Sequence, residues 1–487
     1  MALLITIEKP MQRTTKIVAT LGPASSDPVI LKAMLEAGVD VVRMNFSHGT
    51  AGEHIARADL VRRLATEVGR AVGIMVDLQG PKVRIGKFAE GKVTLKRGDR
   101  FVLDADCELG NQDCVGLDYK ELTSDVTRGT VLLLDDGRIQ LTVDEVKGRK
   151  IFTHVNQGGI LSNNKGINRQ GGGISAPALT TKDMEDIRTA AQMEADYLAV
   201  SFPKSSADMY MARTLLHAAG GTALLVAKIE RAEAIPALED ILGASDAIMV
   251  ARGDLGVEVG DAAVPALQKR MIRRARACNK LVITATQMME SMIASPIPTR
   301  AEVSDVANAV IDGTDAVMLS AETAAGGYPL ETVQAMARIC LEAEKEQGSG
   351  LDDAFLQRVF TRIDQSIAMA ALFTAHHLKV KAIAALTQSG STALWMSRLD
   401  AGVPIYALTP EIGTSRKAAL FRGVYPVVMQ YHTSDSETLL AEAEQVLVSH
   451  QIVQAGDLVV ITIGEPIGKA GGTNTLKILK VGAHQRS

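Results

Sequence analysis

The sequence predicts an α/β protein built on a (β/α)8 TIM barrel, with a small all-β domain inserted into the barrel and a doubly wound α/β domain after it. Between Lys16 and Glu322, short apolar runs recur eight times, each followed by helical periodicity or, once, by a long interruption. Eight strands alternating with helices are what such a barrel requires. The interval between the third and fourth runs is several times longer than most others. This excess predicts an inserted domain.

We expect the eight apolar runs to form the barrel strands. They are KIVATLG from Lys16, VDVVRMNF from Val39, GIMVDLQG from Gly73, ADYLAVSF from Ala195, ALLVAKIE from Ala223, SDAIMVARG from Ser245, LVITATQM from Leu281 and DAVMLSAET from Asp315. The stretch AIMV in the sixth run shows no alternation, which is typical of a strand buried on both faces. Residues 1–83 and 174–348 are therefore assigned to the barrel.

Residues 84–173 have a different pattern. The stretches KVTLKRGDRFVL, GTVLLLDDGRIQLTV and KGRKIFTHV alternate or run short between Gly and Asp-Gly turns, which predicts a small β-barrel domain. Gly80 and the glycines of QGGGIS, residues 170–175, flank it. These glycines are either ordinary loop residues or a hinge that lets the insert close over the barrel mouth as a lid.

Residues 364–487 alternate again between helical and strand patterns, which predicts the doubly wound α/β domain. A polar, weakly patterned link from residue 348 to residue 364 precedes it.

The composition favours a cytoplasmic protein that acts on small molecules. The formal net charge is −4, from 52 basic and 56 acidic residues, so a nucleic acid or an anionic membrane is not expected as the main partner. No apolar run approaches the length of a membrane span. The four cysteines lack metal-ligand spacing, and the apolar stretch at the N-terminus is too short for a signal peptide.

Polar side chains follow the predicted barrel strands, where enzymes with this fold place their active sites. They are Arg43, Asn45, Asp77, Lys228, Glu230, Arg252, Asp254, Thr286 and Glu322. Glu230 and Asp254 follow neighbouring strands, so they can share one hard cation such as Mg²⁺. Lys228 lies two residues before Glu230, on the same face of its strand. A lysine beside a metal carboxylate and an incoming phosphate suits phosphoryl transfer.

Two other classes of function remain open from these residues alone. Lys228 could form a Schiff base, as in aldolase-type lyases, although the carboxylates beside it would raise its pKa unless a divalent metal offsets them. A metabolite sensor without turnover would bind its ligand in the C-terminal domain. Such a sensor has no need for the set of polar strand ends.

Seven stretches resemble the pyruvate kinase family, and the match covers nearly the whole chain in order. They are KIVATLGPAS, VVRMNFSHG, DLQGPKVR, KIERAEAI, MVARGDLGVE, ATQMMESMI and PTRAEVSDVANAVIDGTDAVMLSAETAAGGYP. The resemblance, which is to bacterial members activated by AMP or a sugar phosphate, implies phosphoryl transfer from phosphoenolpyruvate to ADP, giving pyruvate and ATP. It also implies a lid, a regulatory C-terminal domain and a homotetramer.

The resemblance implies roles for the strand-end residues. Arg43 would hold the phosphoryl group, and Lys228 would neutralise that group and the developing enolate. Glu230 and Asp254 would ligate Mg²⁺ or Mn²⁺. The backbone amides of Gly253 and Asp254 would bind the substrate carboxylate, and Thr286 would contact that carboxylate and help relay the proton. Ser320 and Glu322 would belong to the wider proton relay. The nucleotide would be bound by Asn45, Arg84 and Lys165.

Two departures from the family pattern matter. The family binds K⁺ through the residues equivalent to Asn45, Ser47, Asp77 and the Leu78 carbonyl, and K⁺-requiring members carry a glutamate where this chain has Lys82. The ammonium of Lys82 can supply the charge internally, so we expect activity without K⁺; the alternative is a solvated lysine. The stretch KGINRQG, residues 165–171, departs from the family's lid-hinge motif but keeps Lys165.

The stretch LTQSGST, residues 386–392, follows a predicted strand and precedes a helix. Hydroxyls and backbone amides at such a junction can cradle a phosphate. The stretch resembles the family's effector loop, and GEPIGKAGGTNTLK, residues 464–477, resembles the loop that closes over it. A phosphorylated sugar or AMP would bind Thr387, Ser389, Ser391 and Thr392. The alternative is an ordinary Ser/Gly turn.

Overall fold

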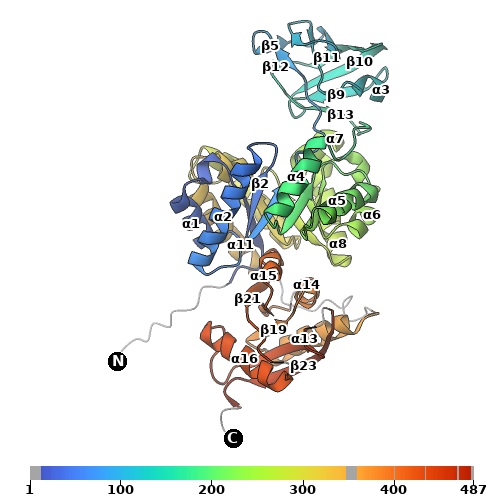
Figure 1. The fold of residues 1–487 in the computed structure, drawn as a ribbon. Helices are drawn as coiled ribbons and strands as arrows, with labels where there is room; N and C mark the ends of the chain where they lie inside the picture. Colours follow the sequence, from blue (N-terminus) through green and yellow to red (C-terminus); the bar gives the residue numbers. More distant parts are fainter. Residues whose placement is uncertain (1–11, 347–358, 400, 434, 469–470, 484–487) are drawn as a thin grey trace.

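The computed structural model describes residues 12–346, 359–399, 401–433, 435–468 and 471–483. The N-terminal apolar stretch up to residue 11, most of the link from residue 348, and residues 469–470 of the expected closing loop lie outside them. Figure 1 shows the barrel in the middle, the insert beyond one end and the C-terminal domain beyond the other.

The barrel predicted from the eight runs is confirmed. Its strands are β1 (Lys16–Thr20), β2 (Val41–Asn45), β3 (Gly73–Asp77), β14 (Tyr197–Val200), β15 (Leu224–Ile229), β16 (Ala247–Ala251), β17 (Leu281–Ala285) and β18 (Ala316–Leu319). They close in the order β1-β18-β17-β16-β15-β14-β3-β2, and the paired neighbours run parallel. Because all strands point the same way, their carboxyl ends meet at one mouth.

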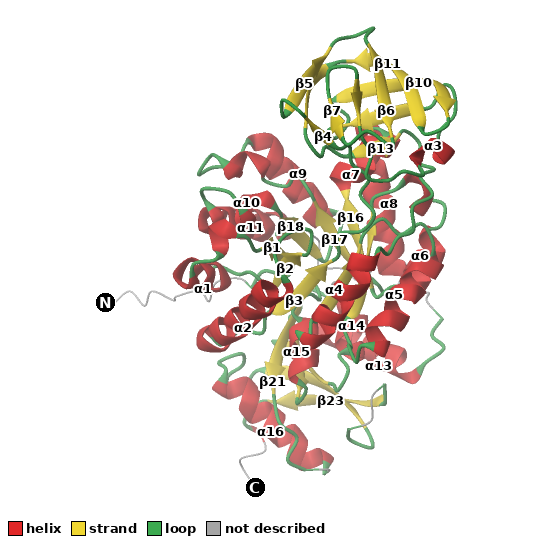
Figure 2. Cartoon of the chain, turned by 45° about the horizontal axis from the view of Figure 1, so that its top comes forward, coloured by secondary structure: helices red, strands yellow, loops and turns green. Residues whose placement is uncertain are grey.

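Helices surround this barrel (Figure 2). They are α1 (Pro28–Glu36), α2 (Ala51–Val68), α4 (Thr181–Gln192), α5 (Ser206–Ala218), α6 (Leu238–Ala244), α7 (Arg252–Val259), α8 (Val264–Ala277), α9 (Arg300–Ile311), α10 (Ala321–Ala324) and α11 (Pro329–Glu344), with 3-10 turns at Pro23–Ser25, Ala232–Ala234, Asp261–Ala263 and Glu290–Ile293. Thr50, Thr180 and Thr299 begin α2, α4 and α9 with capping boxes, which satisfy first-turn amides. No helix in the described part of the chain has the length and apolar character of a membrane span.

The insert is a β domain with its own apolar core. Its main sheet has the order β13-β9-β10-β11-β6-β8, beside the pairs β12-β5 and β4-β7. The strands are β4 (Lys87–Phe88), β5 (Lys92–Leu95), β6 (Arg100–Asp104), β7 (Leu109–Gly110), β8 (Cys114–Val115), β9 (Val131–Leu134), β10 (Ile139–Lys147), β11 (Lys150–Gln157), β12 (Gly159–Ser162) and β13 (Ile167–Arg169). A single helical turn, α3 (Leu122–Asp125), interrupts them.

The C-terminal domain has a five-stranded sheet in the order β21-β20-β19-β22-β23. Its elements are α13 (Ile363–Leu378), β19 (Ala382–Leu386), α14 (Ser391–Ser397), β20 (Ile405–Thr409), α15 (Ile412–Ala418), β21 (Val424–Val428), α16 (Ser436–Ser449), β22 (Leu458–Gly464) and β23 (Thr473–Lys480). The first four strands of this order are parallel, and β23 runs antiparallel to β22. Helices α13 and α14 pack in one apolar cluster and α16 in another, which confirms the doubly wound prediction.

The C-terminal domain is fixed to the barrel at the starts of the strands. Arg398 donates to Asp315, which precedes β18, over 2.8 Å, and both side chains are fully buried. Arg416 of α15 donates to Asp196, just before β14, over 2.9 Å. One apolar cluster runs from the barrel interior into this domain. The C-terminal domain is therefore attached at the end of the barrel opposite to its mouth.

Candidate active site

Two of the expected cations meet at one buried carboxylate in the barrel mouth. Asp77, at the end of β3, accepts a hydrogen bond of 2.6 Å from Arg43 Nε, and its other oxygen lies 3.1 Å from Lys228 Nζ. Burial alone would raise the pKa of Asp77, but the charges of Arg43 and Lys228 outweigh burial and lower it. Asp77 is therefore an anion that holds both cations in place.

Lys228 is surrounded by oxygen atoms. Its Nζ lies 3.0 Å from Glu230 Oε1 and donates to Ser201 Oγ over 2.8 Å. Burial would lower the pKa of Lys228, but Asp77 and Glu230 together raise it. An amine that stays protonated at neutral pH is a poor nucleophile, so the environment favours a charge-neutralising role over a Schiff base.

Glu230 and Asp254 have the chemistry of a hard-cation site. Glu230 is buried, and its second oxygen accepts from Phe202 N over 2.8 Å. Burial raises the pKa of Glu230, and the nearby carboxylates of Asp254 and Asp77 add to this rise. A divalent cation between Glu230 and Asp254 would relieve the repulsion. No group of three or more metal-binding side chains occurs among the described residues, and Mg²⁺ sites with one or two carboxylates rely on substrate oxygens for the rest.

Lys82 lies beside this pair. Its Nζ is 2.9 Å from Asp254 Oδ1. Burial would lower the pKa of Lys82, and the Asp254 carboxylate instead raises it. The sequence predicts the positive charge of Lys82 at the monovalent-cation residues, whereas in the structure Lys82 pairs with Asp254, one of the two expected metal ligands.

The expected monovalent-cation residues are nevertheless close together. Asn45 Oδ1 accepts from Ser47 N over 3.1 Å. The Leu78 carbonyl accepts from Ser201 Oγ over 2.7 Å, and the Asp77 carbonyl accepts from Phe46 N over 2.9 Å. These contacts form a compact polar corner between β2 and β3.

The expected carboxylate site joins the ends of β16 and β17. Gly253 N, in the first turn of α7, donates to Thr286 Oγ1 over 2.8 Å. Thr286 has a φ of 69°, which is strained for a β-branched residue and is typical of functional sites. Arg252 donates to the Thr286 carbonyl over 2.6 Å and to Asp305 over 2.8 Å. Arg252 therefore supports the site, while the Gly253 amide must exchange its partner to reach a ligand.

Glu322 fixes the neighbouring loops. Its two oxygens accept from Ser320 N over 2.7 Å and from Met289 N over 3.2 Å, and the side chain is buried. These bonds link the end of β18 to the loop after β17.

The expected nucleotide residues of the insert lie on adjoining backbone segments. Ile85 N donates to the Lys165 carbonyl over 2.9 Å. Arg84 N donates to Asp118 over 2.7 Å, and Arg84 Nη1 to the Asn164 carbonyl over 3.2 Å. Lys165 Nζ pairs with Asp135 over 2.6 Å. A Cβ at the next residue, Gly166, would lie 3.1 Å from Lys82 Cε, so this segment packs against Lys82, whose ammonium pairs with Asp254.

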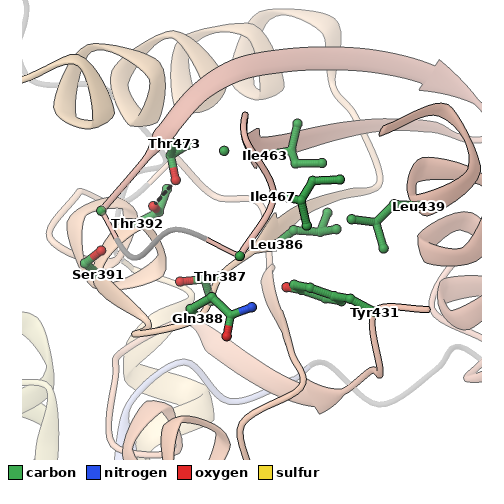
Figure 3. A pocket seen from close by; sticks show the side chains of 13 residues that line it. Leu386, Thr387, Gln388, Ser391, Thr392, Tyr431, Leu439, Ile463, Ile467 and Thr473 are labelled. Carbon is green, nitrogen blue, oxygen red and sulfur yellow. Dashed lines mark hydrogen bonds between the residues drawn. The ribbon is translucent and has the colours of Figure 1, made fainter. Parts of the chain in front are cut away.

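The expected effector residues lie at a pocket of the C-terminal domain (Figure 3). Its hydroxyl groups come from Thr387, Ser391, Thr392 and Thr473, and its apolar side from Leu386, Tyr431, Leu439, Ile463 and Ile467. Thr392 and Thr473 hydroxyls are 2.7 Å apart. Ser389 is exposed and donates to Ser391 over 3.2 Å, so it stands beside the pocket rather than in its lining.

Sequence reasoning missed four residues. Ser201 and Thr20 carry hydroxyls at the ends of β14 and β1, where they accept from Lys228 and Arg43. Their signal was the same as that of the other residues, a polar side chain after a buried run. Gln388 and Tyr431 also line the pocket at which the expected effector residues lie. Tyr431 had no such signal because it lies far along the chain from the effector loop.

Comparison with known proteins shows the family of the chain. The family model described as the pyruvate kinase barrel domain matches residues 12–333, and the model of the pyruvate kinase alpha/beta domain matches residues 365–479. The chain belongs to the pyruvate kinase family. Its membership confirms the predicted enzyme class, a phosphotransferase with a TIM barrel.

Curated relatives match almost end to end. Pyruvate kinase II of Salmonella typhimurium is 54% identical over 475 residues, 96% of this chain and 99% of the relative. Pyruvate kinase of Haemophilus influenzae is 54% identical over 460 residues, 93% of this chain and 96% of the relative. That of Mycobacterium intracellulare is 42% identical over 473 residues, 97% and 99% of the two chains.

The junction between insert and barrel contains a buried acid. Glu258, near the end of α7, accepts from Ala232 N over 2.8 Å, and its backbone carbonyl accepts from Gly171 N over 3.0 Å. Asn168 of β13 approaches its carboxyl within 3.5 Å. Burial raises the pKa of Glu258 to about 7, and the charge of Glu233 contributes. Glycines 171–173 all have positive φ, so this connection is restricted to glycine-like conformations.

Glu258→Gln should change how stability depends on pH. Between its ordinary pKa of 4.5 and about 7, the native carboxyl binds a proton that the unfolded chain releases, so the stability of the native enzyme falls as pH rises through this window. The glutamine variant should therefore unfold at a higher temperature than the parent at about pH 8, and the difference should shrink near pH 5. Scanning calorimetry measures both, with exposed Glu185→Gln as control. An equal response of Glu258→Gln and Glu185→Gln would refute the assignment.

Proposed function

We propose that this enzyme transfers the phosphoryl group of phosphoenolpyruvate to ADP in the barrel mouth, giving pyruvate and ATP in the last step of glycolysis. The observation that carries the proposal is the meeting of Arg43 and Lys228 at Asp77, beside the carboxylates of Glu230 and Asp254. In this proposal residues 1–83 and 174–348 form the catalytic barrel, 84–173 the lid, and 364–487 the regulatory domain.

Charge neutralisation is the proposed work of the barrel residues. Arg43 and Lys228 would face the phosphoryl oxygens from the Asp77 side, so that charge on the transferring group meets fixed cations. Glu230 and Asp254 would hold Mg²⁺ or Mn²⁺, which when bound neutralises phosphate oxygens. Lys228 would also stabilise the enolate left after transfer, since its ammonium stays charged.

Binding of the substrate carboxylate and protonation of the enolate are proposed for the ends of β16 and β17. The amides of Gly253 and Asp254 open α7, where a helix N-terminus attracts an anion. Thr286 would contact that carboxylate and help relay the proton to enolpyruvate. Ser320 and Glu322 would belong to the wider relay. The strained backbone of Thr286 supports its functional role.

The nucleotide would bind between insert and barrel mouth. Arg84 and Lys165 would meet the phosphates of ADP, with Asn45 on the barrel side. Lys165 pairs with Asp135, and a nucleotide phosphate would replace that carboxylate as its partner. Packing of this segment against Lys82 supports a nucleotide position close to the metal carboxylates.

Lys228→Met tests the activity. Losing one preorganised charge at the transferring group should lower pyruvate release from phosphoenolpyruvate, ADP and Mg²⁺ by about 10²–10³-fold or more, with little change in exposed Lys32→Met. The assay couples pyruvate to NADH oxidation. A product that forms without ADP, or a borohydride-trapped adduct on Lys228, would instead identify a lyase.

We also propose that Lys82 makes K⁺ dispensable. Three carboxylates contact three cations in the mouth: Asp77, Glu230 and Asp254, and Arg43, Lys82 and Lys228. A divalent cation that binds Asp254 would displace Lys82 from that carboxylate. The released ammonium would then supply the positive charge at the monovalent-cation residues Asn45, Ser47, Asp77 and Leu78.

Lys82→Gln should therefore have two opposite effects. Without the competing ammonium, the free enzyme should bind Mn²⁺ several-fold more tightly, because Asp254 has lost its counter-ion. Without the internal cation, pyruvate release should become dependent on K⁺. Electron paramagnetic resonance of free Mn²⁺ reports the first effect, and the coupled assay with and without K⁺ reports the second. If Lys82→Gln matched exposed Lys87→Gln in both assays, the pairing of Lys82 with Asp254 would have no part in cation binding, and the proposal would be refuted.

Regulation is proposed to act through the C-terminal pocket, with AMP or a phosphorylated sugar as activator. Thr387, Ser391 and Thr392 supply hydroxyls, and Ser389 stands at the rim. The described lining residues are uncharged, with hydroxyls on one side and the Tyr431 ring and aliphatic side chains on the other. A ligand that carries one phosphate group on a less polar molecule suits such a lining.

We propose a homotetramer as the working form. Apolar side chains of the C-terminal domain are exposed on α13 and β23, among them Ile363, Phe373 and Ile478. Their burial between subunits would be favourable. Sedimentation measures the state directly.

Ser391→Asp should abolish activation and spare the basal rate. A carboxylate at the hydroxyl cluster repels a phosphate, whereas the barrel mouth lies in another domain. Saturation curves for phosphoenolpyruvate, with and without AMP or sugar monophosphates, measure the response, and exposed Ser449→Asp is the control. Unchanged activation by every one of these ligands would show that the effector binds elsewhere.

A further inference from the structure

The insert brings two of the four cysteines into contact. Cys107 follows β6 and Cys114 opens β8, and their Sγ atoms lie 3.8 Å apart. Both thiols are free and half-exposed. The approach depends on glycine, because a Cβ at Gly116 would collide with the Cys107 carbonyl oxygen and one at Gly110 would lie 2.7 Å from the Cys114 carbonyl oxygen. The fold therefore holds the two thiols within reach of each other.

The loop between them is held by its own hydrogen bonds. Asn111 N donates to the Cys114 carbonyl over 2.8 Å, and Asn111 Oδ1 accepts from Cys114 N over 3.1 Å and from Asp113 N over 2.8 Å. Because Cys114 is fixed on both sides, little conformational entropy would be lost when its sulfur is joined to Cys107.

We propose that Cys107 and Cys114 form a reversible intramolecular disulfide when the enzyme meets hydrogen peroxide. A neutral oxidant suits the site better than an anionic disulfide such as oxidised glutathione. Carboxylates surround the pair in sequence, at Asp104, Asp106, Glu108 and Asp113. Lys150 and Arg149 pair with Asp104 and Asp106, which leaves an excess of negative charge.

The reaction balances with one peroxide. One thiol of the pair, once deprotonated, attacks first. Its thiolate displaces hydroxide from the peroxide as the O–O bond breaks, giving a sulfenic acid. The thiolate of the other cysteine, whose sulfur lies 3.8 Å away, then attacks that sulfur, the S–O bond breaks with loss of hydroxide, and the S–S bond forms. Two thiols lose two electrons and two protons, and the peroxide becomes two waters.

The disulfide would lie next to the segment that holds Arg84. Gly86 N donates to the Gly116 carbonyl over 2.8 Å, and Arg84 N donates to Asp118 over 2.7 Å. Formation of the disulfide would draw the two sulfurs together and shift residues 114–118, whose Asp118 side chain and Gly116 carbonyl accept hydrogen bonds from the backbone of Arg84 and Gly86. Given the proposed nucleotide role of Arg84, oxidation should change the KM for ADP more than the KM for phosphoenolpyruvate.

The experiment treats the full-length enzyme with stoichiometric hydrogen peroxide. We expect the loss of two hydrogen masses per chain, a cross-linked peptide that joins Cys107 to Cys114, and recovery of four thiols after dithiothreitol. The double variant Cys278→Ser/Cys340→Ser should behave identically. Cys107→Ser and Cys114→Ser should each lose the cross-link, and the cysteine of the pair that remains should stop at a sulfenic acid that reacts with dimedone.

A gain of oxygen mass without the cross-link, or a cross-link between chains, would overturn the disulfide. These mass readouts do not depend on catalysis, so they stand apart from the Lys228→Met test of the activity. A cross-linked enzyme with an unchanged KM for ADP would overturn the coupling to Arg84.

Discussion

The candidate active site depends on one buried anion at the end of β3. Asp77 is only 1% exposed, yet it contacts both Arg43 and Lys228. Without this carboxylate, two like charges would be forced together in a poorly solvated mouth, at a high desolvation cost. With it, the cations are paired to different oxygens of one side chain. The strands on either side of β3, which are β2 and β14, supply Arg43 and the hydroxyl of Ser201 that supports Lys228.

The insert is connected to the charged side chains of the barrel mouth through Lys82. This residue lies on the connection into the insert, and its ammonium reaches Asp254 on α7. Gly171, on the returning connection, donates to the Glu258 carbonyl of that helix. Both connections of the insert therefore end on α7, which also presents the Gly253 amide. Movement of the insert would therefore act directly on the helix that carries Asp254, an expected metal ligand, and the expected substrate-carboxylate site.

The barrel and its strand ends could be predicted from the sequence because both follow local rules. Buried runs such as AIMV identify strands, and parallel strands in a closed barrel bring their ends together. Which charged side chains pair with each other in the folded protein could not be predicted in the same way. Lys82 was expected at the monovalent-cation corner, yet it pairs with Asp254, 172 positions along the chain. The contact of Cys107 with Cys114 depends on how β6, β7 and β8 come together, which residue patterns do not specify.

A series of contacts and one strand join the expected effector loop, residues 386–392, to Lys228. Thr414 of α15 donates to the Gln388 carbonyl in that loop over 2.7 Å, and Arg416, half a turn further, donates to Asp196 over 2.9 Å. Asp196 precedes β14, which ends at the Ser201 hydroxyl that accepts from Lys228. Helix α15 and strand β14 are stiff elements in packed surroundings, so a displacement at one end has few ways to be absorbed. Strand β14 in this way connects its start, where the C-terminal domain is attached through Asp196, to its end, where Ser201 contacts Lys228.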